Sequence, residues 1–153
     1  MPTIADSDIS GIAHVIQLAI APVFLLTGIA SLLGVMANRL ARVIDRARDI
    51  EEKLAGLEGD AAARAQRQLT VLGQRARLAS WAINFCTTAA LLICADIATL
   101  FIDAFVGTQL RWLVGALFIL TMIAVIGGLV SFLREVYLAT HTLSIGRSRQ
   151  KKQ

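Results

Sequence analysis

Two aspartates inside a long apolar segment are the residues of this sequence that could do chemistry. Asp96 and Asp103 lie seven residues apart in the stretch 82–106, with Thr99 between them. At about 100° per residue, the three side chains share one face of a helix. A carboxylate within hydrocarbon costs about 2.5–3.5 kcal/mol on insertion scales, so such residues usually face protein or water and mark function. The pattern predicts an intramembrane polar site on this face.

Neighbouring apolar segments offer groups that could join this site. Counting inward from the outer ends of the helices places Asp96 about 15 Å deep, at the level of Pro22 and Thr121. Proline removes an amide donor and frees the carbonyl of Leu18 within the first apolar segment. A second, outer polar cluster is expected beside Asp103, made of His14, Gln17 and Arg111.

Two explanations of the polar face lead to different functions. In the first, carboxylates of several subunits line an ion or proton channel. A homo-oligomer is then required because three helices cannot enclose an aqueous path, and we expect a cyclic one with the second span toward the axis. In the second, a protonated Asp96 hydrogen-bonds a neighbouring helix, and the protein is a membrane scaffold whose hairpin binds a cytoplasmic partner. An axial polar cavity would favour the channel, and a dry interface within the subunit would favour the scaffold.

The composition predicts a polytopic membrane protein. The chain has 153 residues, of which 56% are hydrophobic and 17% are charged, and the apolar residues fall in three long blocks. A soluble domain averages about 25% charged residues. The sequence shows no nucleophile motif, phosphate loop or metal-ligand spacing, so we expect no enzyme, cofactor or metal site. Membrane context explains the net charge of +4 better than a nucleic-acid partner does.

We predict a single all-α membrane domain over residues 1–153, with three transmembrane helices and a cytoplasmic antiparallel helical hairpin between the first and the second. Close helix packing is expected at small residues of the first and third spans, which are Gly28, Ala30, Gly34, Gly115, Gly127, Gly128 and Ser131. The last helix should end near Gly146. The segments in order are a first span at 9–37, the hairpin at 38–80, a second span at 81–106, a short outer turn at 107–109, a third span at 111–133, and a helix extension with a basic tail at 134–153.

Apolar residues in the predicted hairpin recur with the alternating three-and-four spacing of a coiled-coil seam. Gly56 and Gly59 bracket the turn, and Asp60 is expected to cap the returning helix. Asp49 and Lys53 have the favourable i,i+4 order for an ion pair. The first arm carries Leu40, Val43, Ala47, Ile50, Leu54 and Leu57, and the returning arm carries Ala62, Ala65, Leu69, Leu72, Ala76 and Ala79.

The charge distribution predicts the orientation. Of 15 Lys and Arg residues, nine lie in 38–80 and five in 134–153, which leaves only Arg111 on the other side. The positive-inside rule then places the N-terminus outside and both the hairpin and the C-terminus in the cytoplasm. The basic residues of this cytoplasmic face are also expected to contact anionic lipid.

The run IQLAIAPVFLLTGIASLLGVMANRLARVIDRAR, followed by a short hairpin and two more apolar helices, resembles a bacterial membrane family known as domain of unknown function number twenty-seven twenty-one. The segments APVFLLTG and NRLAR are the most specific parts of the resemblance, which covers roughly residues 9–145. It implies an integral protein of the bacterial cytoplasmic membrane, and it carries over no activity and no catalytic residues.

Overall fold

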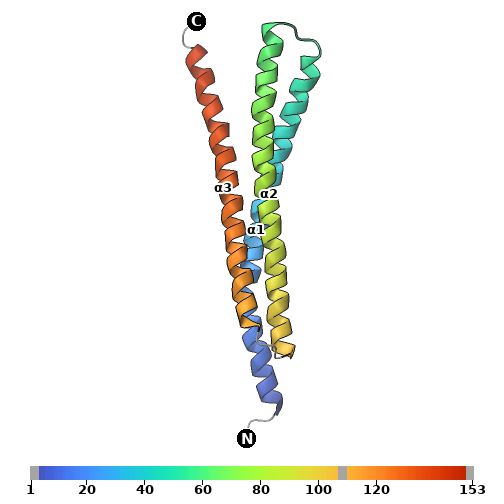
Figure 1. Cartoon of the computed structure of the whole chain (residues 1–153), viewed down its shortest axis with the longest axis vertical. Coiled ribbons are helices and arrows are strands. Elements are labelled where there is room, and N and C mark those ends of the chain that lie inside the picture. Colours follow the sequence, from blue (N-terminus) through green and yellow to red (C-terminus); the bar gives the residue numbers. More distant parts are fainter. Residues whose placement is uncertain (1–3, 107–109, 151–153) are drawn as a thin grey trace. The chain divides into compact units, whose positions relative to one another are not determined.

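The described part of the chain is all-helical, with three helices long and apolar enough to span a membrane, which confirms this part of the predicted fold class. The structure, a computed structural model, describes the backbone of residues 4–106 and 110–150 and the side chains of residues 13, 14, 16–106 and 110–139. The predicted outer turn at 107–109 therefore lies outside the described residues. Figure 1 shows the three helices, which are α1 (Ile4–Leu54), α2 (Asp60–Val106) and α3 (Arg111–Gln150).

Each helix has the length and composition of a membrane span. The apolar spans fall within Ile16–Leu54, Asp60–Val106 and Arg111–Ala139. In each helix, only 17% of the most apolar 18-residue window is buried within the chain. The remaining apolar surface needs lipid or further protein to cover it, because soluble proteins rarely expose continuous apolar surface over whole helices. A helix also satisfies its own backbone hydrogen bonds, as hydrocarbon requires.

The helices contribute to two compact units. The first unit contains Met1–Leu33 and Phe85–Ile126, and the second contains Gly34–Asn84 and Gly127–Gln153. Each helix has one segment in each unit, so each unit is built from pieces of all three helices. The predicted polar site falls in the first unit and the predicted hairpin in the second.

Several local predictions need correction. The helix α3 does not end at Gly146 but continues to Gln150, because a single glycine costs only about 1 kcal/mol inside a helix. A Cβ atom on Gly28, Gly34 or Gly115 would meet no atom of another helix within 4 Å. These glycines are therefore not close-approach positions within the chain. The helix α1 runs continuously through Pro22.

The turn between α1 and α2 is tight and depends on glycine. The amides of Gly56 and Leu57 donate to the carbonyls of Lys53 and Leu54, each at 3.2 Å. Gly59 has a φ of 61°, in the left-handed region that glycine adopts without steric cost. Its carbonyl accepts the first helical hydrogen bond of α2 from Ala63, at 3.2 Å. Gly59 rather than Asp60 is therefore the N-cap, and Asp60 complements the helix dipole from the first turn.

The predicted hairpin seam follows the less exposed side of both arms. Val43, Ala65 and Ala79 are buried, and the other seam residues on the helices are half-buried. Leu57 does not belong to the seam, because α1 ends before it and its side chain is 39% exposed. On the exposed side of the first hairpin arm, Lys53 Nζ lies 3.0 Å from Asp49 Oδ2, which confirms the expected pair.

The topology can be tested with single cysteines in a variant whose Cys86 and Cys94 are replaced by alanine. Glu58 in the turn and Arg111 at the start of α3 are both exposed, and the whole of α2 separates them. Glu58→Cys and Arg111→Cys should therefore react with an impermeant maleimide from opposite sides of the membrane. Labelling of both from the same side would contradict three spans.

The seam can be tested with two alanines of α2 that lie two residues apart. Ala65 is 8% exposed, whereas Ala63 is exposed. Ala65→Asp should lower the free energy of unfolding by about 2–3 kcal/mol, because it buries an unpaired charge. Ala63→Asp should change it by less than about 0.5 kcal/mol. Thermal unfolding in detergent measures both, and equal effects would show that the seam is not packed.

Candidate functional site

Asp96 is a buried carboxylate within the apolar part of α2. Its side chain is 2% exposed, and its Oδ1 atom has no hydrogen-bond partner among the described residues. Buried polar atoms nearly always have a partner, so an orphaned carboxylate oxygen inside a membrane span needs an explanation. A proton, a cation or a water molecule would each satisfy this oxygen.

Asp96 lies on the wall of a large hollow in the first unit, which we call the span hollow. Its volume is about 1260 Å³, and all three helices contribute to its walls. The structure brings together here five of the predicted residues, from both the midplane site and the outer cluster: His14, Pro22, Asp96, Asp103 and Arg111. Apolar and aromatic side chains, including Trp112 and Phe118, complete the walls.

Two hydroxyls that were predicted to join this site turn away from it. Thr121 is completely buried, and its Oγ1 donates to the carbonyl of Leu117 at 2.9 Å. Thr99 Oγ1 donates to the carbonyl of Ala95 at 2.8 Å. Both bonds run back one helical turn, which is how Ser and Thr satisfy themselves inside a helix. Gln17 is exposed and does not line the span hollow.

Asp103 has a structural partner. Its Oδ1 accepts a hydrogen bond at 2.9 Å from the backbone amide of Leu110, the residue directly before α3. Leu110 in turn caps this helix, because its carbonyl accepts from the amides of Leu113 and Val114 at 2.8 and 3.2 Å. The carboxylate thus fixes the start of α3 against the end of α2. Asp103 and Asp96 share one helix face and one hollow, but they have different environments.

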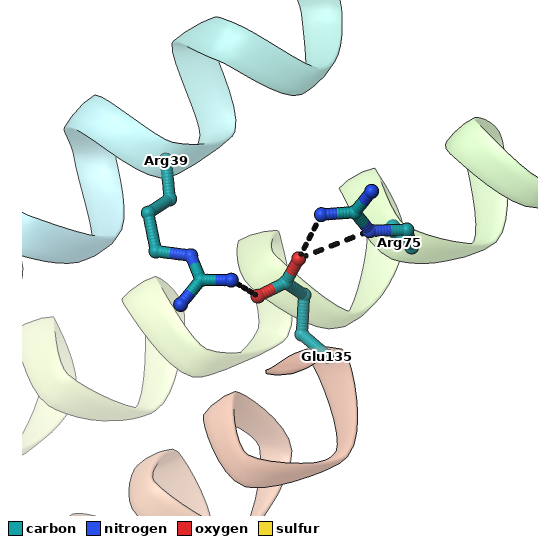
Figure 2. Close-up of polar contacts among 3 residues, drawn as sticks. All are labelled: Arg39, Arg75 and Glu135. Carbon is teal, nitrogen blue, oxygen red and sulfur yellow. Dashed lines mark hydrogen bonds and ion pairs between the residues drawn. The ribbon is translucent and has the colours of Figure 1, made fainter. Parts of the chain in front are cut away.

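A second buried carboxylate, which sequence reasoning missed, lies in the second unit. Glu135 of α3 is 1% exposed and lies between arginines of the two other helices, as Figure 2 shows. Arg75 of α2 donates to Glu135 Oε1 from both Nε, at 3.1 Å, and Nη2, at 2.9 Å. Arg39 Nη2 of α1 lies 3.1 Å from Glu135 Oε2. This last contact is an ion pair by distance alone, since Oε2 receives no hydrogen bond from a described residue.

The arginines keep partial contact with water while the carboxylate does not. The Arg39 side chain is 30% exposed and that of Arg75 is 20% exposed. Arg39 is also held from a second side, because its guanidinium carbon lies 5.3 Å from the centre of the Phe132 ring. Such a cation–π contact is worth about 0.5–2 kcal/mol. Glu135 therefore joins segments of α1, α2 and α3 at one point.

A sequence signal for this arrangement exists in retrospect. Glu135 is the sole acidic residue after Asp103, and basic residues dominate the segment that contains it. Arg39 and Glu135 each lie two residues beyond the end of a predicted apolar span. Opposite charges at the same membrane level on neighbouring helices could have been paired on that ground. Among the described residues, no group of three or more His, Cys, Asp or Glu side chains could hold a metal ion.

Comparison with known proteins identifies a family but no activity. A family model described as "Protein of unknown function (DUF2721)" matches residues 19–145, which is most of the chain. No curated protein and no solved structure matches. The matched residues include Asp96, Glu135 and both arginines of the ion cluster.

The ion cluster predicts a strong effect of Glu135→Gln. This change leaves two arginines without their counter-charge, so the free energy of unfolding should fall by about 2–4 kcal/mol. The neighbouring Arg134 is exposed, and Arg134→Gln should have little effect. Thermal unfolding in detergent compares the two variants.

Replacing all three charged residues of the cluster by leucine provides the complementary test. Removing a buried ion cluster as a whole is often neutral or stabilising, because no uncompensated charge remains. The triple variant should therefore be more stable than Glu135→Gln. If Glu135→Gln proved as stable as Arg134→Gln, the cluster would not hold the helices together.

Proposed function

We propose that this chain, which belongs to the DUF2721 family of proteins of unknown function, forms a homo-oligomeric membrane channel in which a cation or proton binds at Asp96. The observation that carries the proposal is the orphaned Oδ1 of Asp96 on the wall of the span hollow. A structural aspartate would be expected to have its hydrogen bonds within the chain, as Asp103 has with Leu110.

The charges around the span hollow favour a cation. Asp96 and Asp103 carry two negative charges when ionised, and Arg111 carries one positive charge. With His14 neutral, the hollow has a net charge of −1, which attracts cations most strongly when the surrounding dielectric constant is low. A proton on Asp96 is the alternative occupant, because a deeply placed carboxyl can bind and release one.

Conduction requires more than one copy of the chain, since three helices cannot enclose an aqueous path. The apolar surfaces left uncovered on all three helices support an oligomer. Ala30 and Gly34 lie four residues apart on α1 and give it an exposed pair of small residues, on which another helix could pack closely. We propose a cyclic assembly with α2 toward the axis, so that the span hollows of several subunits open to a common path.

The proposed location is a bacterial cytoplasmic membrane, with the N-terminus outside and the hairpin and C-terminus in the cytoplasm. The charge bias supports this orientation, because Arg111 is the sole Lys or Arg residue outside the two basic segments. The hairpin would then extend into the cytoplasm. If Asp96 proves to have no role in conduction, the hairpin becomes the site of function, as the docking element of a scaffold protein.

Asp96→Asn tests the proposal because it keeps the shape of the side chain and removes the titratable charge. In liposomes, the Asn variant should assemble like the wild type, and cation or proton flux should fall by about tenfold or more, as expected when a key electrostatic group is lost. Asp45→Asn is the matched control, because Asp45 is an exposed aspartate of the hairpin, and its flux should be unchanged.

Asp96→Leu separates the two functions. For a channel, this variant should also lose flux while it keeps its oligomer size. For a scaffold in which Asp96 bonds another subunit, Asp96→Leu should dissociate the oligomer, because a buried partner loses its hydrogen bond. An assembled wild type without flux across a range of pH and voltage would overturn the channel proposal.

A further inference from the structure

A second hollow, in the second unit, is surrounded by arginines. It has a volume of about 510 Å³ and is lined by Arg39, Arg42, Val43, Arg46, Leu72 and Arg75. We call it the arginine hollow. On α1, Arg42 follows Arg39 by three residues and Arg46 follows Arg42 by four, which places the three arginines along one helix face. Arg75 reaches the same hollow from α2.

The arginine hollow has an unbalanced positive charge. Glu135 pairs with Arg39 and Arg75 and offsets one of the four positive charges. Arg42 and Arg46 are exposed, and neither has an ion pair with a described residue. The nearby Asp49 is paired with Lys53 on the exposed side of the first hairpin arm. A net charge of +3 thus surrounds a space that an anion could enter.

The hollow lies at the level where the apolar spans end. Arg39 follows the first predicted span by two residues, and Arg75 precedes the start of the second predicted span by six residues. Each α-helical residue adds about 1.5 Å, so these guanidinium groups fall within about 10 Å of the hydrocarbon boundary. This is the depth of phospholipid headgroups, which extend several ångströms beyond the hydrocarbon core.

We propose that the arginine hollow binds the phosphate of an anionic phospholipid. Guanidinium groups bind phosphate oxygens with paired, charge-assisted hydrogen bonds. Glu135 and Phe132 hold Arg75 and Arg39 in place before the ligand arrives, whereas Arg42 and Arg46 can close on it from the solvent side. Val43 and Leu72 supply apolar wall against the glycerol and the first acyl carbons. This site does not depend on conduction at Asp96.

Native mass spectrometry of the full-length protein in detergent tests the proposal with defined lipids. The wild type should bind dioleoyl phosphatidylglycerol at least tenfold more tightly than dioleoyl phosphatidylcholine. Arg42→Gln combined with Arg46→Gln should reduce phosphatidylglycerol affinity on the order of tenfold, because two phosphate-binding forks are lost. The single variants should give partial losses, which keeps the test valid if the double variant is unstable.

The control removes the same charge elsewhere. Arg48 and Arg64 are exposed arginines of the hairpin that do not line the hollow, and Arg48→Gln with Arg64→Gln should keep affinity within about twofold of the wild type. If both double variants lost phosphatidylglycerol affinity equally, the binding would be general charge attraction, and the proposal of a site in the arginine hollow would be wrong. Displacement of the lipid by millimolar inorganic pyrophosphate would overturn the lipid as ligand and indicate a soluble phosphate compound instead.

Discussion

The structure of the second unit depends on the burial of one carboxylate. Glu135 is almost completely removed from solvent, and an unpaired charge in such a position costs several kcal/mol. Two arginines from two other helices compensate it, one through a pair of hydrogen bonds and one through an ion pair. Since the charge of Glu135 is compensated only when both arginines are near, the cluster selects one arrangement of the three helix segments.

Among the described residues, Asp96 and Glu135 are deeply buried carboxylates, and they differ in a way that separates structure from function. Glu135 has arginines as partners, and its role is to join helices. Glu135 Oε2 also lacks a hydrogen bond but has the Arg39 guanidinium 3.1 Å away, whereas Asp96 Oδ1 has neither a hydrogen bond nor an ion pair among the described residues and lies on the wall of a hollow. A group whose bonding capacity is unfilled within the chain is available to an ion, a proton or a neighbouring subunit. The same reasoning explains why Asp103, which holds the Leu110 amide, is assigned to the fold rather than to the proposed ion site.

Periodicity and composition predicted the parts of the structure that depend on local sequence. Three apolar blocks gave the spans, the three-and-four spacing gave the hairpin arms, and the carboxylate in an apolar run gave Asp96. The hydrogen-bond partners of side chains on neighbouring helices could not be predicted in the same way, because they depend on the rotamer of each side chain and on how the helices are rotated. Thr121 shows this clearly, since its depth was consistent with a contact to Asp96, yet its hydroxyl bonds its own helix. Glu135 was missed because it lies just outside the apolar segment, where a charged residue normally faces solvent.

If Asp96 binds a cation or proton from solution, water must reach it in the assembled protein, whereas the equally buried Thr121 stays dry. Methanethiosulfonate reagents react with thiolates, which form almost only where water has access. In a variant with Cys86 and Cys94 replaced by alanine, Asp96→Cys and Thr121→Cys are compared in intact membranes with a charged methanethiosulfonate. We expect rapid modification at position 96 and none at position 121. Equal inertness of the two cysteines would contradict the proposed role of Asp96, because a dry Asp96 can neither pass an ion nor exchange a proton with solvent.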